Sequence, residues 1–158
     1  MISTSGDGFA RREHRLVRLI EQRLQGDDSG LVGNARVRGL PEMVRRHGLL
    51  QVVAFLRSKG ADAAENGSPG KRGSGDCDQQ LLDLLQNALQ EDLEAVPRSE
   101  KGGVCKLAPA DLAHLGEDSP TEYLYLNESA IQVAVWIQRL AAARADLDEA
   151  RQVCGGDG

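Results

Sequence analysis

GLPEMVRRHGLLQVVAFLRSKG, residues 39–60, combines a helix breaker, an apolar helix and the densest positive charge in the chain. The pair His47-Gly48 predicts a helix end, because glycine adopts the left-handed conformation after a helix without a steric penalty. A second helix is predicted from about Leu49 to Ser58, and it is apolar on almost every side. A helix with that pattern is expected at the centre of the core.

The same stretch places cations at two predicted helix ends. Arg45, Arg46 and His47 close the first helix, and Arg57 and Lys59 close the second. Cations at a helix C-terminus are stabilised by the negative end of the helix dipole. That role explains two or three of these side chains. Binding of phosphate is an alternative use for the rest.

Composition favours one helical domain. The 158 residues are 41% hydrophobic and only 3% aromatic, so a core of Leu, Val, Ile and Ala is expected, which suits helices. No apolar run approaches the roughly 20 residues that cross a bilayer, and no secretory signal is recognisable. The three cysteines are far apart and fit a reducing compartment. A cytoplasmic protein without membrane contact is therefore expected.

Helical periodicity predicts an all-α fold of about six helices in a single domain, residues 1–158. The predicted helices cover about residues 9–25, 31–47, 49–58, 77–91, 109–115 and 127–153. A kink or break is expected at Leu40-Pro41, because proline inside a straight helix costs about 3 kcal/mol. Residues 1–8, 61–76 and 154–158 are expected to be flexible.

Several side chains are predicted to begin helices or to fill the core. The predicted caps are Asp28 or Ser29, Asp76 or Asp78, Ser119 followed by Pro120, and Asn127. Gly116 is predicted to stop the short helix before it. In the core, Phe55 is predicted to pack against the last helix together with Leu49, Val53 and Ile131.

Charge is distributed unevenly along the chain. Residues 1–60 carry 11 Lys and Arg against 6 Asp and Glu, a net charge of +5, whereas residues 61–158 carry 8 against 18, a net charge of −10. Such a protein can contact a polyanion with one face and a basic protein with another.

Short elements of this sequence resemble the small subunit of type III-B CRISPR effector complexes, the Cmr complexes. In the first stretch they are Leu40-Pro41, Met43-Val44, His47-Gly48, Leu49-Leu50, Ala54-Phe55 and Ser58-Lys59-Gly60. Near the C-terminus they are Tyr123-Leu124, Asn127-Glu128-Ser129-Ala130 and Trp136-Ile137-Gln138-Arg139-Leu140-Ala141. Asn127 and Arg139 stand where that family usually has Thr and Lys. The order of the elements makes the resemblance specific.

The resemblance implies a non-catalytic structural subunit of an RNA-guided, RNA-targeting effector complex in antiviral defence. Such subunits stack beside the backbone subunits and further copies of themselves, and they line the channel that holds guide RNA paired to target RNA. Contacts to phosphate and 2′-hydroxyl groups are expected, because the guide supplies sequence specificity by base pairing. The low aromatic content agrees, since it leaves no platform of rings for single-stranded bases.

The predicted RNA-binding residues are basic and centre on the His47-Gly48 pair. Four of them fall at the ends of the two helices that this pair joins, so their side chains can converge. The full predicted set is Arg36, Arg45, Arg46, Arg57, Lys59, Arg139 and Arg144. A second basic row, Arg11, Arg15 and Arg18, lies on one side of the first predicted helix and is the alternative RNA-binding face.

No pattern in the sequence indicates catalysis, a metal site or a cofactor. His14, His47 and His114 lack metal-ligand spacing, and the acidic clusters resemble solvated helix faces. Two other readings stay open. The first is a helix-turn-helix regulator of duplex DNA, although the helix after His47-Gly48 is too apolar for base recognition. The second is a helical adaptor that binds only proteins.

Overall fold

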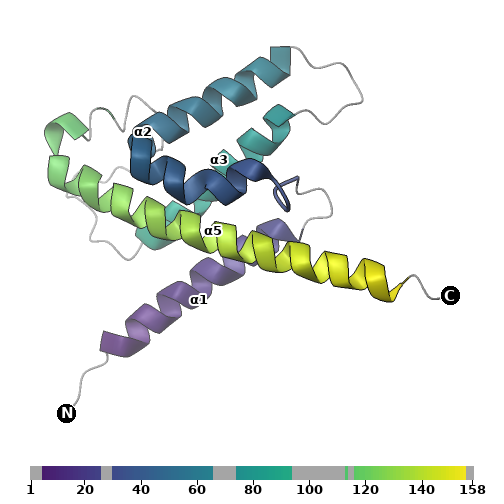
Figure 1. The fold of residues 1–158 in the computed structure, drawn as a ribbon. Coiled ribbons are helices and arrows are strands. Elements are labelled where there is room, and N and C mark those ends of the chain that lie inside the picture. Colours follow the sequence, from purple (N-terminus) through teal and green to yellow (C-terminus); the bar gives the residue numbers. More distant parts are fainter. Residues whose placement is uncertain (1–4, 26–29, 66–73, 94–112, 114–115, 156–158) are drawn as a thin grey trace.

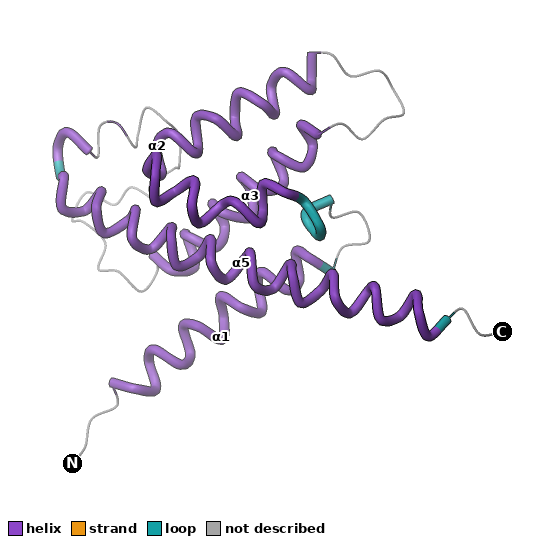
Figure 2. Tube along the Cα trace, in the orientation of Figure 1, coloured by secondary structure: helices purple, strands orange, loops and turns teal. Residues whose placement is uncertain are grey.

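The chain is almost entirely helical in the part that the computed structural model describes, which comprises residues 5–25, 30–65, 74–93, 113 and 116–155. Four helices organise this part: α1 (Ser5–Leu24), α2 (Ala35–Glu65), α3 (Ser74–Leu93) and α5 (Pro120–Cys154). Residues 116–118 are helical as well, and none of the described residues forms a strand (Figures 1 and 2). The predicted all-α class is confirmed.

Helix α2 is the central element. It packs against both α3 and α5, while α1 contacts α3 and α5. Figure 1 shows α2 as two arms that meet at a sharp bend, with α5 alongside the first arm. We call residues 35–47 the first arm and residues 49–65 the second arm.

The bend in α2 lies at Gly48 and not at Leu40-Pro41. Gly48 has φ 79° and ψ 161°, a combination that residues other than glycine rarely adopt. Pro41 is buried within the first arm, and the helix continues through it. A proline can remain in a helix at some cost in free energy, whereas a residue with positive φ interrupts the helix. The helix end predicted at His47-Gly48 is therefore confirmed, and the kink predicted at Pro41 is wrong.

Helix α2 begins later and ends later than predicted. It begins at Ala35 because Asn34 caps it: the Arg36 N–H donates to Asn34 Oδ1 at 2.8 Å. The predicted caps at residues 28 and 29 lie outside the described residues. At its other end α2 continues to Glu65, and α3 begins at Ser74, so both helices extend into the predicted loop. Residues 66–73 lie outside the description.

Other predicted helix boundaries also differ from the structure. Asp78 does not begin α3 but lies inside it, buried, as the partner of Arg36. Gly116 is itself helical, but the short helix predicted over residues 109–115 lies outside the described residues except for residue 113, so the stop predicted at Gly116 stays a prediction. Helix α5 is continuous from Pro120, so Asn127 lies within it and does not begin it. Ser119 and Pro120 occupy the predicted positions, but the Ser119 side chain makes no capping hydrogen bond.

The core is aliphatic, as the composition predicts. Its buried members come from all four helices and from the segment before α2, and they are Leu, Val, Ile and Ala side chains. The second arm contributes Leu49, Val52, Val53 and Leu56, which lie on one face. Phe55 lies on the flank of that face and is 38% exposed, so its predicted place in the core is wrong.

Candidate nucleic-acid interface

The bend at Gly48 divides the predicted cations between two arms that differ in direction. Arg45 and Arg46 lie at the end of the first arm, as predicted. Arg57 and Lys59 do not lie at a helix end, because the second arm continues to Glu65. At 1.5 Å per residue they follow the bend by about 14 and 17 Å. We predicted that these four side chains converge because they lie at two neighbouring helix ends. Only Arg45 and Arg46 lie at a helix end, so that argument for convergence does not hold.

Arg45 and Arg46 are exposed just before the bend and share one acidic neighbour. Arg46 Nε lies 2.7 Å from Glu42 Oε1, and Arg45 Nη1 lies 3.9 Å from Glu42 Oε2. All three side chains are more than half exposed. Exposed ion pairs of this kind contribute little to stability, so both guanidinium groups can exchange the carboxylate for another anion.

Two hydrogen bonds to side chains of α5 cap the second arm at the bend. Because Gly48 interrupts α2, the first N–H groups of the second arm have no carbonyl within the helix to bond. The Leu49 N–H donates to Asn127 Oδ1 at 2.8 Å, and the Leu50 N–H donates to the Tyr123 hydroxyl at 3.3 Å. Asn127 is thus a cap, as its residue type predicts, but it caps the second arm of α2 rather than its own helix.

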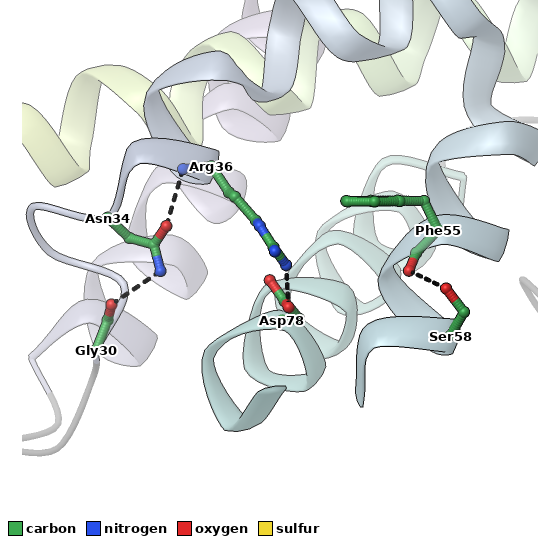
Figure 3. Close-up of polar contacts among 6 residues, drawn as sticks. All are labelled: Gly30, Asn34, Arg36, Phe55, Ser58 and Asp78. Carbon is green, nitrogen blue, oxygen red and sulfur yellow. Dashed lines mark hydrogen bonds and ion pairs between the residues drawn. The ribbon is translucent and has the colours of Figure 1, made fainter. Parts of the chain in front are cut away.

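Arg36 is engaged inside the fold and does not extend into solvent with the other cations. Its guanidinium forms an ion pair with Asp78, which is 2% exposed, and it lies over the Phe55 ring at 5.2 Å from the centroid (Figure 3). These contacts join both arms of α2 to α3. Of the predicted set, Arg36 is therefore the least available to an external phosphate.

Arg38 is absent from the predicted set, but its side chain is exposed, whereas that of Arg36 is partly buried. It lies seven residues before Arg45, on the same face of the first arm, and both side chains are exposed. Gln138 of α5 donates a hydrogen bond from Nε2 to the Arg38 carbonyl, and exposed Arg139 follows it. We call Arg38, Arg45 and Arg139 the basic seam: two exposed arginines on one face of the first arm, and a third on α5 next to the residue that bonds the Arg38 carbonyl. The i, i+7 spacing was the sequence signal for Arg38.

The remaining basic candidates lie away from the basic seam. Arg144 is less exposed than Arg45 and Arg46, and its Nε lies 3.8 Å from Asp148 Oδ1 in the next turn of α5. Arg57 and Lys59 are exposed on the second arm. On α1, Arg15 and Arg18 are exposed, while the side chain of Arg11 lies outside the description. That row remains a separate candidate face.

Two further features of the structure bear on the kind of site. Within the described ranges, no group of three or more His, Cys, Asp and Glu side chains could hold a metal ion. None of the described helices combines the length and the apolar character that a bilayer crossing requires.

Residues 11–144 match the family model described as CRISPR-associated protein (Cas_Cmr5). This match spans most of the chain and includes the bend, the basic seam and the two capping residues of α5. No curated protein and no solved structure matches the chain.

Proposed function

The chain belongs to the Cas_Cmr5 family, the small subunits of type III-B Cmr effector complexes, and on that premise we propose that it contacts guide and target RNA through the basic seam. In this proposal the chain is a non-catalytic subunit. It packs beside other effector subunits and further copies of itself, and it binds the sugar–phosphate backbone of the RNA.

The observation that carries the proposal is the grouping of exposed arginines on two helices that hydrogen bonds hold together. Arg38 and Arg45 share a face of the first arm, and exposed Arg139 follows Gln138, the α5 residue whose side chain donates a hydrogen bond to the Arg38 carbonyl. Guanidinium groups bind phosphate oxygens in a bidentate geometry, so a row of them suits the repeated phosphates of an RNA backbone. Backbone contacts of this kind hold RNA without reading its sequence.

The second arm argues against the helix-turn-helix reading. In that class of protein the helix after the turn places polar side chains in the major groove. Here that helix buries Leu49, Val52, Val53 and Leu56 in the core. Only the side chains on the exposed side of this helix could contact bases, so duplex DNA is a weaker candidate ligand than RNA.

Exposed apolar side chains on α5 support contacts with protein neighbours. Leu124 and Tyr125 are 63% and 49% exposed near its beginning, and Leu147 and Val153 are 56% and 77% exposed near its end. A subunit that packs between others needs such surfaces. An adaptor role and RNA binding are compatible in one subunit, and the two are separable by experiment.

The proposal is tested by measuring RNA affinity against salt concentration. The variant Arg45→Ala with Arg139→Ala should weaken binding equally for different sequences and reduce the salt slope by roughly 1–2 units, because two phosphate contacts are lost. Arg23→Ala with Arg151→Ala removes the same charge from exposed positions outside the seam and is the matched control. Equal losses in the two variants would show nonspecific attraction and would refute the assignment to this face.

A further inference from the structure

Phe55 is an exposed aromatic ring that the Arg36 guanidinium contacts and whose helix face Lys59 shares. It is one of only two phenylalanines in the chain, and it leaves 38% of its surface outside the core. We propose that Phe55, Ser58 and Lys59 form a platform on which one unpaired RNA base stacks. This inference rests on the proposed function, because it concerns a second contact to the same RNA.

The three residues of the platform lie on one side of the second arm. Ser58 and Lys59 follow Phe55 by three and four residues, which places them above it on the same helix face. All three are exposed. The aromatic ring provides a surface for a base, the hydroxyl can bond a ribose, and the ammonium can bond the adjoining phosphate. The base, the ribose and the phosphate of one nucleotide could therefore each contact one of the three side chains.

The ring of Phe55 is held in place before any ligand arrives. The Arg36 guanidinium lies 5.2 Å from the ring centroid, and buried Asp78 fixes that guanidinium by an ion pair (Figure 3). The Ser58 hydroxyl donates to the Phe55 carbonyl at 2.9 Å. A ring that is already ordered loses little conformational freedom on stacking, so more of the stacking energy appears as affinity.

Charge around the ring favours a nucleotide over an apolar protein side chain. Lys59 shares the helix face of Phe55, and Arg36 contacts the ring itself. An aromatic ligand that carries negative charge matches this surface, and a nucleotide has both properties. The proposed platform departs from the expectation that this chain offers no ring for single-stranded bases, because a single ring serves one base and not a continuous strand.

The test compares three probes of equal phosphate count: single-stranded oligouridylate, an abasic strand and a fully paired RNA duplex. The full-length chain should bind oligouridylate about 5-fold or more tightly than the abasic strand, as stacking of one base predicts. Phe55→Ala should reduce its affinity for oligouridylate to the abasic level and leave the affinity for the other two probes unchanged. Phe55→Trp should keep the preference, and Phe55→Leu should lose it while the fold is retained.

Salt separates the platform from the phosphate contacts. The effect of Phe55→Ala should persist unchanged across salt concentrations, because stacking releases no counterions, whereas Lys59→Ala should reduce the salt slope. Unchanged binding of oligouridylate by Phe55→Ala, or an equal loss for the abasic strand, overturns the platform alone. Failure of the unaltered chain to bind any probe overturns the proposed function as well. Reduced capture of another effector subunit with intact RNA binding would assign Phe55 to a protein contact and overturn the platform.

Discussion

Asn127→Ala tests whether α5 stabilises the bend of α2. The substitution removes the acceptor that lies 2.8 Å from the N–H of Leu49, a residue that is completely buried. Loss of a helix cap typically costs about 1 kcal/mol, and leaving a buried donor without a partner costs about 1–3 kcal/mol. Alanine also favours α5 itself by roughly 0.6 kcal/mol over asparagine. We therefore expect a net loss of about 1–2 kcal/mol in the free energy of unfolding.

Urea unfolding measures this loss directly, and a fall of roughly 2–8 °C in Tm should accompany it. The matched control is Asn127→Asp, which keeps an acceptor oxygen at the same place and adds negative charge at the N-terminus of the second arm. This control should be at least as stable as the parent at neutral pH. A loss below about 0.3 kcal/mol for Asn127→Ala, or equal losses in both variants, would refute the capping argument.

Gly48→Ala should lower the free energy of unfolding by about 1–3 kcal/mol in a thermal or urea scan. The loss arises from φ and not from crowding, since an added Cβ would meet only the Tyr123 hydroxyl, at 3.4 Å, and Asn127 Oδ1, at 3.7 Å. Arg36→Ala should cost about 3 kcal/mol by urea unfolding, because it leaves the buried Asp78 carboxylate unpaired, and a second change, Asp78→Asn, should restore much of that stability. Glu42→Gln should raise RNA affinity in a low-salt titration, because it removes the negative charge beside Arg45 and Arg46. An unchanged or weaker affinity would count against the basic seam.

The sequence predicts the all-α fold class well, because helical periodicity is a local property of the sequence. The aliphatic stripes, the helix end at His47-Gly48 and Pro120 at the start of α5 all follow from residues within a few positions of one another. The position of the bend was harder to predict, because Pro41 and Gly48 both disfavour a straight helix. Within α2, Gly48 alone has dihedral angles that a helix cannot contain.

The candidate site was less predictable because its geometry depends on distant parts of the chain. Arg36 and Arg38 look alike in sequence, yet the Arg36 side chain pairs with Asp78 in α3, whereas the Arg38 side chain is exposed and bonds the Gly33 carbonyl before α2. Phe55 belongs to an apolar helix by composition, but the width of the buried face leaves it on the flank. The orientation of each side chain was set by partners whose positions no local pattern predicts.

The two hydrogen bonds at the bend also determine when the capped form of the bend can appear. Asn127 and Tyr123 are separated from their partners by 78 and 73 residues. A ribosome makes both arms of α2 long before it makes these side chains, so the bend stays without its caps during most of synthesis. Contacts of such sequence separation also form late in refolding, since a long loop must close first. A chain that is released early therefore lacks both the capped bend and the second helix of the basic seam.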